Sequence, residues 1–183
     1  MSVESERLFG TRNLATIALF AAMWGVLNSI FAPVVFRMTG LPILCDMVGF
    51  ASLTLAVWLV RRFGVASMVG VIATLINFLF NPSGVHFLGF TVASFVYDIL
   101  ARLMGYERAF GKPSRITAYI LLNSVLSAAV AGLIIGSFLM SPEALVRWGG
   151  ALEWSGLHAV GGFIGGFVGA ASIAALVRRK VAR

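Results

Sequence analysis

The feature that most limits what this chain can fold into is a series of long apolar stretches. The first runs from Leu14 to Pro33 (LATIALFAAMWGVLNSIFAP), and comparable stretches follow along the rest of the chain. A helix of about 20 apolar residues crosses the hydrocarbon core of a bilayer. Because only 11% of the residues are charged and 60% are apolar, too few charges remain to wet the surface of a soluble domain. The chain is therefore predicted to be an integral membrane protein.

The same stretches predict an all-α membrane domain with six transmembrane helices. Helices satisfy their own backbone groups in lipid, and the continuous apolar runs lack the alternation of barrel strands. Turn-forming residues separate the runs, and the third run is short, so the turn that follows it is either a tight turn or partly re-entrant. We expect residues 1–183 to form one domain. The expected spans are about 13–32, 43–60, 65–80, 87–104, 116–140 and 157–177.

Basic residues predict the orientation of these spans. With the N-terminus in the cytoplasm, the outer loops hold only Arg37 and Arg147. The inner segments then hold the other twelve basic residues: Arg7, Arg12, Arg61, Arg62, Arg102, Arg108, Lys112, Arg115, Arg178, Arg179, Lys180 and Arg183. This bias favours an even number of spans, both termini cytoplasmic, in a multi-pass protein of the cell membrane. The net charge of +7 is thus read as a topology signal, and no nucleic-acid partner is expected.

Several kinds of chemistry find no support in the residues. Cys45 is the single cysteine, which excludes an internal disulfide and argues against a thiolate metal site. The first residues carry two acids and no small-residue cleavage site, so we expect no removable signal peptide. Walker A, CxxC and HExxH patterns are absent. We therefore expect no metal, no cofactor and no ATPase or metalloprotease activity in this chain.

Polar and aromatic residues near the expected outer ends of the spans are candidates for substrate binding. Trp24 and Asn28 lie one helical turn apart on the first span. Asn81, His86 and Phe90 surround the NPSG turn and offer hydrogen-bonding and stacking groups, although turn formation alone would also explain Asn81.

The last outer loop and the sixth span add two candidates. Trp154 belongs to an apolar outer loop that either anchors in the interface or covers a cavity as a lid. His158 heads the glycine-rich sixth span, and it is either a ligand contact or a structural histidine. The GxxxG spacing of Gly161, Gly165 and Gly169 predicts close helix packing.

Three acidic residues have simpler expected roles. Asp98 is expected to pair with Arg102 one turn later and to point toward the inner surface. Asp46 lies at the outer mouth and Glu153 in the last outer loop, and each is either solvated or able to hold a cationic ligand.

The inner half of the first span presents small residues on one face. Ala15, Ala18 and Ala22 recur at helical spacing, and a stripe of small residues lets another helix approach closely in lipid. We identify these alanines as candidates for docking a partner.

The whole pattern resembles the substrate-binding S component of energy-coupling-factor (ECF) vitamin transporters. The resemblance covers about residues 10–180 and rests on four features. These are the six spans with both ends inside, the AxxxA motif Ala18–Ala22 on the first helix, a Pro- and Gly-punctuated first outer loop, and a glycine-rich last helix headed by a polar residue.

The resemblance implies a mechanism and a set of partners. An S component binds a vitamin from outside, under the loops after spans one, three and five. Its alanine-lined first helix docks on a separate transmembrane coupling subunit, which two cytoplasmic ATPases drive, so ATP is used by the partners. The NPSG turn with its aromatic and His neighbours is similar to the thiamin and hydroxymethylpyrimidine branch, while other vitamins remain open.

Other functions make different demands on the same residues. A stand-alone secondary transporter would respond to an ion gradient without partners, with Asp98 as the residue to test. A rhomboid-like serine protease would use Ser83 and His158, but Asn81 replaces the first glycine of its G-x-S-G motif. A structural anchoring protein would bind no small molecule.

Overall fold

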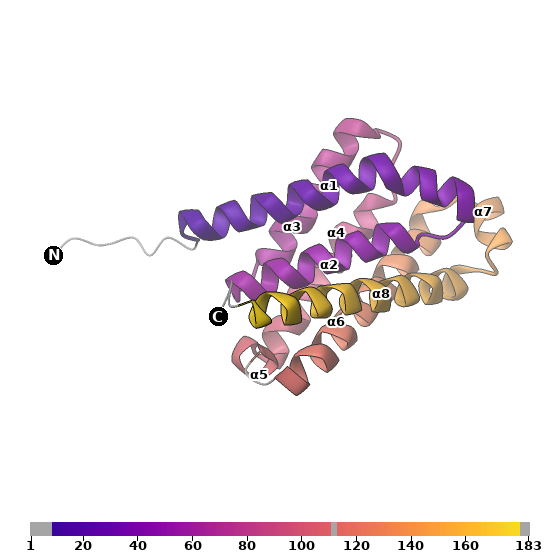
Figure 1. Cartoon of the computed structure of the whole chain (residues 1–183). Coiled ribbons are helices and arrows are strands. Elements are labelled where there is room, and N and C mark those ends of the chain that lie inside the picture. Colours follow the sequence, from indigo (N-terminus) through magenta and orange to yellow (C-terminus); the bar gives the residue numbers. More distant parts are fainter. Residues whose placement is uncertain (1–8, 111–112, 180–183) are drawn as a thin grey trace.

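The computed structural model describes residues 9–110 and 113–179, and this part of the chain is helical with no strand (Figure 1). The segments between the helices are short. The helices are α1 (Thr11–Thr39), α2 (Ile43–Val60), α3 (Val65–Phe80), α4 (Phe87–Met104), α5 (Tyr106–Phe110), α6 (Pro113–Ile134), the π-helical turn η1 (Ile135–Leu139), α7 (Pro142–Arg147) and α8 (Ala151–Arg178).

Five of these helical stretches are long and apolar enough to cross a membrane, which is compatible with a multi-pass membrane protein. They are α1, α2, α4, α8 and the stretch of α6 and η1 from Arg115 to Leu139. The third expected span is present as α3, an apolar helix of only 16 residues. Six spans and cytoplasmic termini therefore stay predictions.

The bundle carries large apolar side chains on its outer surface and several polar side chains in its interior. Leu79, Phe138 and Leu103 are among the large apolar side chains on the outer surface, each at least 75% exposed. Asn77, Asn123 and other polar side chains are buried between the helices. This arrangement suits an apolar solvent around the bundle and polar contacts inside it.

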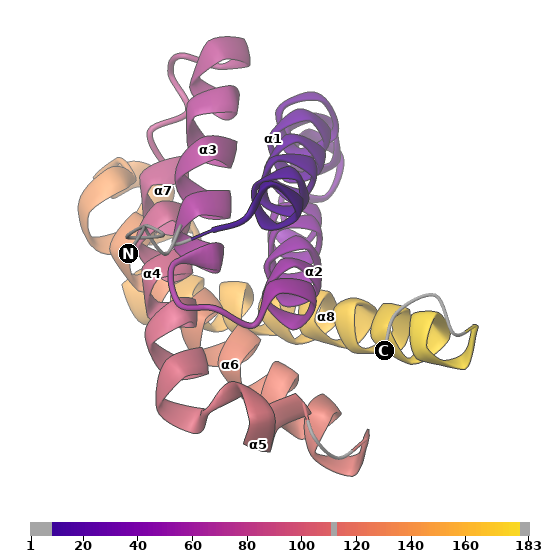
Figure 2. The same cartoon turned by 90° about the vertical axis from the view of Figure 1, so that its left-hand side faces the viewer.

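Helix α2 lies at the centre of the bundle, with 11 of its 18 residues buried. It packs against α8 on one side and against α1 and α3 on the other. Figure 2, in which α1 and α2 are seen nearly end-on, shows α1 and α3 above α2, with α6 and α8 below. One face of α1 consequently stays free of neighbours.

Glycines let α8 fit between α2 and α6, as the GxxxG spacing predicted. A methyl group at Gly165 would approach the Asp46 carbonyl oxygen of α2 to 2.8 Å. On the next face, a methyl group at Gly162 would approach the Ser124 carbonyl oxygen of α6 to 2.6 Å. Both approaches are too close for a side chain, so α8 brings its backbone directly against both neighbours.

Two helices are longer than the spans predicted from the sequence. Helix α1 passes through Pro33 and ends only at Gly40, whose φ of +72° closes it, so most of the expected first outer loop is helical. A proline inside a membrane helix is tolerated where its surroundings accept the lost hydrogen bond. Helix α8 begins at Ala151 instead of 157, after Gly149 and Gly150 reverse the chain with positive φ.

Asp98 does not form the expected pair with Arg102. Its carboxylate instead accepts hydrogen bonds from the backbone N–H of Ala66 (3.2 Å) and from the N–H (2.7 Å) and Oγ (2.6 Å) of Ser67. It therefore caps the N-terminus of α3, where free N–H groups and the helix dipole favour a negative charge. The Arg102 guanidinium lies over the ring of Phe63, 5.2 Å from its centroid.

Candidate binding cavity

A cavity of about 640 Å³ opens at one end of the bundle. It lies at the end that carries α7, on the right in Figure 1, opposite the start of α1 and the end of α8. The end of α1, the start of α2, the turn between α3 and α4, η1, α7 and the start of α8 all contribute to its lining. This volume is in the range of small-molecule sites.

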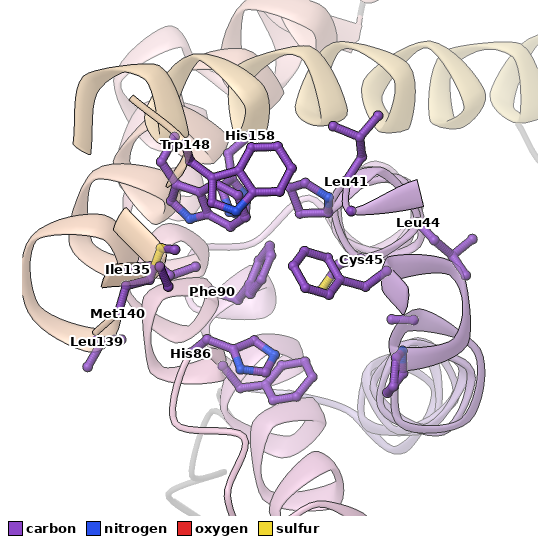
Figure 3. A pocket seen from close by; sticks show the side chains of 18 of the residues that line it. Leu41, Leu44, Cys45, His86, Phe90, Ile135, Leu139, Met140, Trp148 and His158 are labelled. Atoms are coloured by element: carbon purple, nitrogen blue, oxygen red, sulfur yellow. The ribbon is translucent and has the colours of Figure 1, made fainter. Parts of the chain in front are cut away.

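The lining combines aromatic rings, a few polar groups and two cations. In Figure 3, Leu44 and Cys45 of α2 lie across the cavity from Ile135 and Met140, with Phe90 between them. The aromatic residues are Phe36, Phe87, Phe90, Trp148 and Trp154; the polar or titratable ones are Arg37, Cys45, Asn81, His86, Arg147 and His158.

The structure brings five of the seven predicted substrate-binding residues together at this cavity. Asn81 and His86 come from the turn between α3 and α4, and Phe90 from the first turn of α4. Trp154 and His158 come from the first turns of α8, four residues apart and therefore on one face. Segments more than 60 residues apart in the sequence thus meet at one site.

The other two predicted residues do not line the cavity. Trp24 is buried against Gly49 of α2, and its ring meets that of Phe90 edge-on at 6.0 Å. Asn28 is also buried, and its Nδ2 donates a hydrogen bond to the cavity-lining Cys45 Sγ at 3.0 Å. Both side chains support the residues that form the cavity wall.

The most polar feature of the wall is a buried pair between His158 and Asp46. His158 Nδ1 lies 2.9 Å from Asp46 Oδ1, and both side chains are almost completely buried. Because a carboxylate accepts the proton on Nδ1, the ring is held in a fixed orientation with Nε2 on its other side. His158 Nε2 and Asp46 Oδ2 have no hydrogen-bond partner among the described residues.

Aromatic rings surround this histidine. Its ring centroid lies 5.5 Å from that of Phe90 and 5.2 Å from that of Trp154, both edge-on. Trp148 in turn packs 5.3 Å from Trp154 and lies against Gly40 at the end of α1. The buried indole N–H of Trp154 also lacks a partner among the described residues. A ligand here would meet flat apolar surfaces, and two unpartnered polar atoms lie buried in the same wall.

His86 lies just before α4 and packs its ring 4.4 Å from that of Phe87. Burial, followed by the nearby His158, lowers the pKa of His86 below its usual value of 6.5. At neutral pH this imidazole is therefore uncharged, and it offers one donor and one acceptor.

The two outer acids do not occupy the positions expected for cation contacts. Asp46 is neither solvated nor part of the lining, because His158 separates it from the cavity. Glu153 is exposed and packs its side chain toward Gly149. Arg37 and Arg147, the two basic residues of the expected outer loops, also line the cavity, although their residue type gives no signal of this.

Ser83 and His158 do not pair with each other. Ser83 Oγ donates to Asn81 Oδ1 at 3.0 Å within the turn, whereas the imidazole of His158 is engaged by Asp46. The NPSG segment forms a turn between α3 and α4.

The predicted docking residues lie on the free face of α1. Ala15, Ala18 and Ala22 are all exposed, next to the exposed Leu14 and Leu19. Further along the same stripe, Gly25 is covered by α3, where a methyl group would approach Ile76 Cβ to 2.8 Å. The part of this face that a partner can reach is therefore the part that carries Ala15, Ala18 and Ala22, away from the cavity.

Comparisons with protein-family models, with curated proteins and with solved structures gave no match for this chain.

Proposed function

We propose that this protein is the substrate-binding subunit of an ECF-type transporter, which takes up a vitamin or vitamin precursor across the cell membrane. The observation that carries the proposal is the cavity at the end of the bundle with few basic residues. Its wall holds His158 Nε2 and the Trp154 indole N–H without partners. Buried polar atoms usually have hydrogen-bond partners. Two such atoms without partners in the wall of a cavity therefore favour a ligand with polar groups on its ring.

The position of the cavity supports substrate entry from outside the cell. The cavity lies at the end that holds Arg37 and Arg147, whereas the other basic residues of the described ranges belong to the opposite end or to the segments that lead to it. By the positive-inside rule this distribution of charge supports a cavity that faces outward. Ala144 and Arg147 of α7 and the following Trp148 line one side of the cavity, where a lid would lie.

The exposed alanines of α1 support the proposed partners. Because Ala15, Ala18 and Ala22 leave the helix backbone accessible, another helix can pack closely on this half of α1. We propose that the coupling subunit docks there, with two cytoplasmic ATPases supplying the energy. The chain itself would then need neither a nucleotide site nor a cofactor.

The charge of the lining bears on the choice among vitamins. No carboxylate lines the described cavity, so a thiazolium cation such as that of thiamin would meet no opposite charge. Within the vitamin class we therefore favour a flat ring that is neutral or acidic, including the uncharged pyrimidine precursor of thiamin.

Two experiments test the proposal. Mass spectrometry of the detergent-solubilised protein should find a small aromatic compound bound in an amount comparable to that of the protein. Co-expression with a coupling subunit and ATPases should give ATP-dependent uptake of that compound. Uptake driven by a proton or sodium gradient without partners would instead indicate a secondary transporter, and the absence of any bound compound would contradict a binding subunit.

A further inference from the structure

The charged groups that line the cavity all carry the same sign. Arg37, in the last turn of α1, and Arg147, in the last turn of α7, both belong to the lining, and no Asp or Glu of the described chain does. These two arginines come from helices more than 100 residues apart. A basic residue at the end of a helix is ordinarily explained by the helix dipole, but the dipole does not explain why both residues line one cavity.

Both guanidinium groups are available for a ligand. Neither has an ion pair or a hydrogen bond with a described residue, and both are exposed at the mouth. Arg61 at the other end of the bundle differs, because it interacts with Glu107 and with the Trp58 carbonyl oxygen.

The carboxylates nearest to the cavity do not cancel this charge at its wall. Asp46 is fully buried and lies behind the imidazole of His158, which occupies one of its oxygens. Glu143 and Glu153 are exposed and do not belong to the lining. Apolar walls of low dielectric strengthen the field of charges at a cleft, so the two arginines make the mouth favourable for an anion.

The interior below the arginines suits a planar ring. Phe36, Phe90 and Trp154 supply flat apolar surfaces around His158. The Trp154 indole N–H is a donor that is buried without a partner among the described residues. With its Nδ1 proton donated to Asp46, His158 leaves Nε2 as an acceptor beside these rings.

We propose that the ligand of this cavity is a planar aromatic or heteroaromatic anion. Its ring lies among the aromatic residues beside His158, and its negative group lies at the mouth between Arg37 and Arg147. Guanidinium groups bind carboxylates and phosphates well because their planar donor sets match these anions. This inference rests on the proposed function of a substrate-binding subunit and narrows the class of substrate.

Three probes of nearly equal shape test the sign of the charge: naphthalene-2-carboxylate, 2-naphthamide and 2-naphthylmethylammonium. Binding to the purified full-length protein in a non-ionic detergent is followed by titration calorimetry and by quenching of tryptophan fluorescence, with empty micelles as the blank. We expect the carboxylate to bind about tenfold more tightly than the amide, a difference of about 1.4 kcal/mol, and the ammonium probe to bind most weakly.

Variants then locate the effect. Arg37→Gln with Arg147→Gln should abolish the preference for the carboxylate while leaving the affinity for the amide within about twofold. Arg178→Gln at the far end of α8 is the matched control and should retain the preference. High salt should weaken the preference, because the two guanidinium groups are exposed to solvent.

The proposal is overturned if the ammonium probe binds as tightly as the carboxylate, if all three bind equally, if none binds, or if the preference survives the loss of both arginines. A neutral or cationic compound that co-purifies with the protein would reject the anion and leave the binding subunit standing. If no compound co-purifies and no probe of any charge binds, the proposed function fails as well.

Discussion

The two ends of the bundle each hold a buried aspartate, and the partners of the two carboxylates differ. Asp98 accepts backbone and side-chain hydrogen bonds from Ala66 and Ser67 at the start of α3. Asp46 has one side-chain partner, the imidazole of His158, and one oxygen without any partner among the described residues. Both side chains are fully buried, so burial alone does not distinguish them.

This difference distinguishes a polar group with a structural role from one that belongs to a ligand site. A carboxylate that accepts hydrogen bonds from the N–H groups at the start of a helix caps that helix, and its acceptor sites are already used. A carboxylate that holds an imidazole positions a second polar atom, and here that atom belongs to the wall of a cavity. We therefore assign Asp98 to stability and Asp46 to the orientation of His158.

The largest expected effect separates the two ends by function. Ala18→Trp fills the free face of α1 at the end away from the cavity, so it should abolish uptake by the assembled transporter while binding of the co-purified compound stays unchanged. Leu122→Trp, at an outward-facing side chain of α6 that is 51% exposed, is the matched control and should retain uptake. Equal loss of binding and uptake in Ala18→Trp would contradict a docking role for this face.

The next effect tests Asp98 as a capping residue. Asp98→Ala leaves the first N–H groups of α3 without an acceptor, which should cost about 3 kcal/mol and lower the midpoint of thermal unfolding by about 10 °C. Ser67→Ala removes one of the three bonds and should cost about 1 kcal/mol. Thermal unfolding in detergent measures both. Normal stability of Asp98→Ala together with lost transport would instead favour a role in ion coupling.

A smaller effect is expected at the other aspartate. Asp46→Asn keeps an acceptor for His158 Nδ1 but removes the charge that fixes the imidazole and its proton. We expect the affinity for the co-purified compound to fall about tenfold, or about 1.4 kcal/mol, with less loss of stability than in Asp98→Ala. If Asp46→Asn unfolds as early as Asp98→Ala and still binds normally, the comparison between the two carboxylates fails.

The smallest effect concerns His86 and pH. Its pKa is lowered in the folded protein, so below about pH 6.5 the unfolded chain binds more protons than the folded one at this site. Stability should then fall as the pH falls below that value, by less than about 1 kcal/mol. His158, Arg37 and Arg147 line the same cavity and oppose a further positive charge. Thermal unfolding at pH 7.5 and 5.5 should show a smaller difference in His86→Gln than in the unsubstituted protein.

The sequence predicted the helices better than their ends. Apolar length and the GxxxG spacing of α8 were sufficient to predict the helical class and close packing, because both are local properties of a helix in lipid. The sequence placed the end of the first span before Pro33, where a helix in water usually stops. Helix α1 continues through Pro33 and ends at Thr39, before the left-handed Gly40, because a proline is tolerated inside a membrane helix.

Residue type indicated the polar groups of the site, but the sequence did not indicate their partners. Residue type and position predicted five binding residues that line one cavity: Asn81, His86, Phe90, Trp154 and His158. Trp24 and Asn28 had the same chemistry and periodicity, yet they lie in the packed interior behind it. Side-chain chemistry does not reveal which face of a helix meets a cavity and which meets another helix.

That this chain is apolar, helical and asymmetric in charge follows from its composition and from the order of residues along it. Three features emerge only in the folded protein: Asp98 caps α3, Asp46 holds His158, and Arg37 and Arg147 line the same cavity. Each of these facts joins segments distant in sequence. Such contacts depend on how the helices pack. The glycines of α8 and the central position of α2 determine that packing.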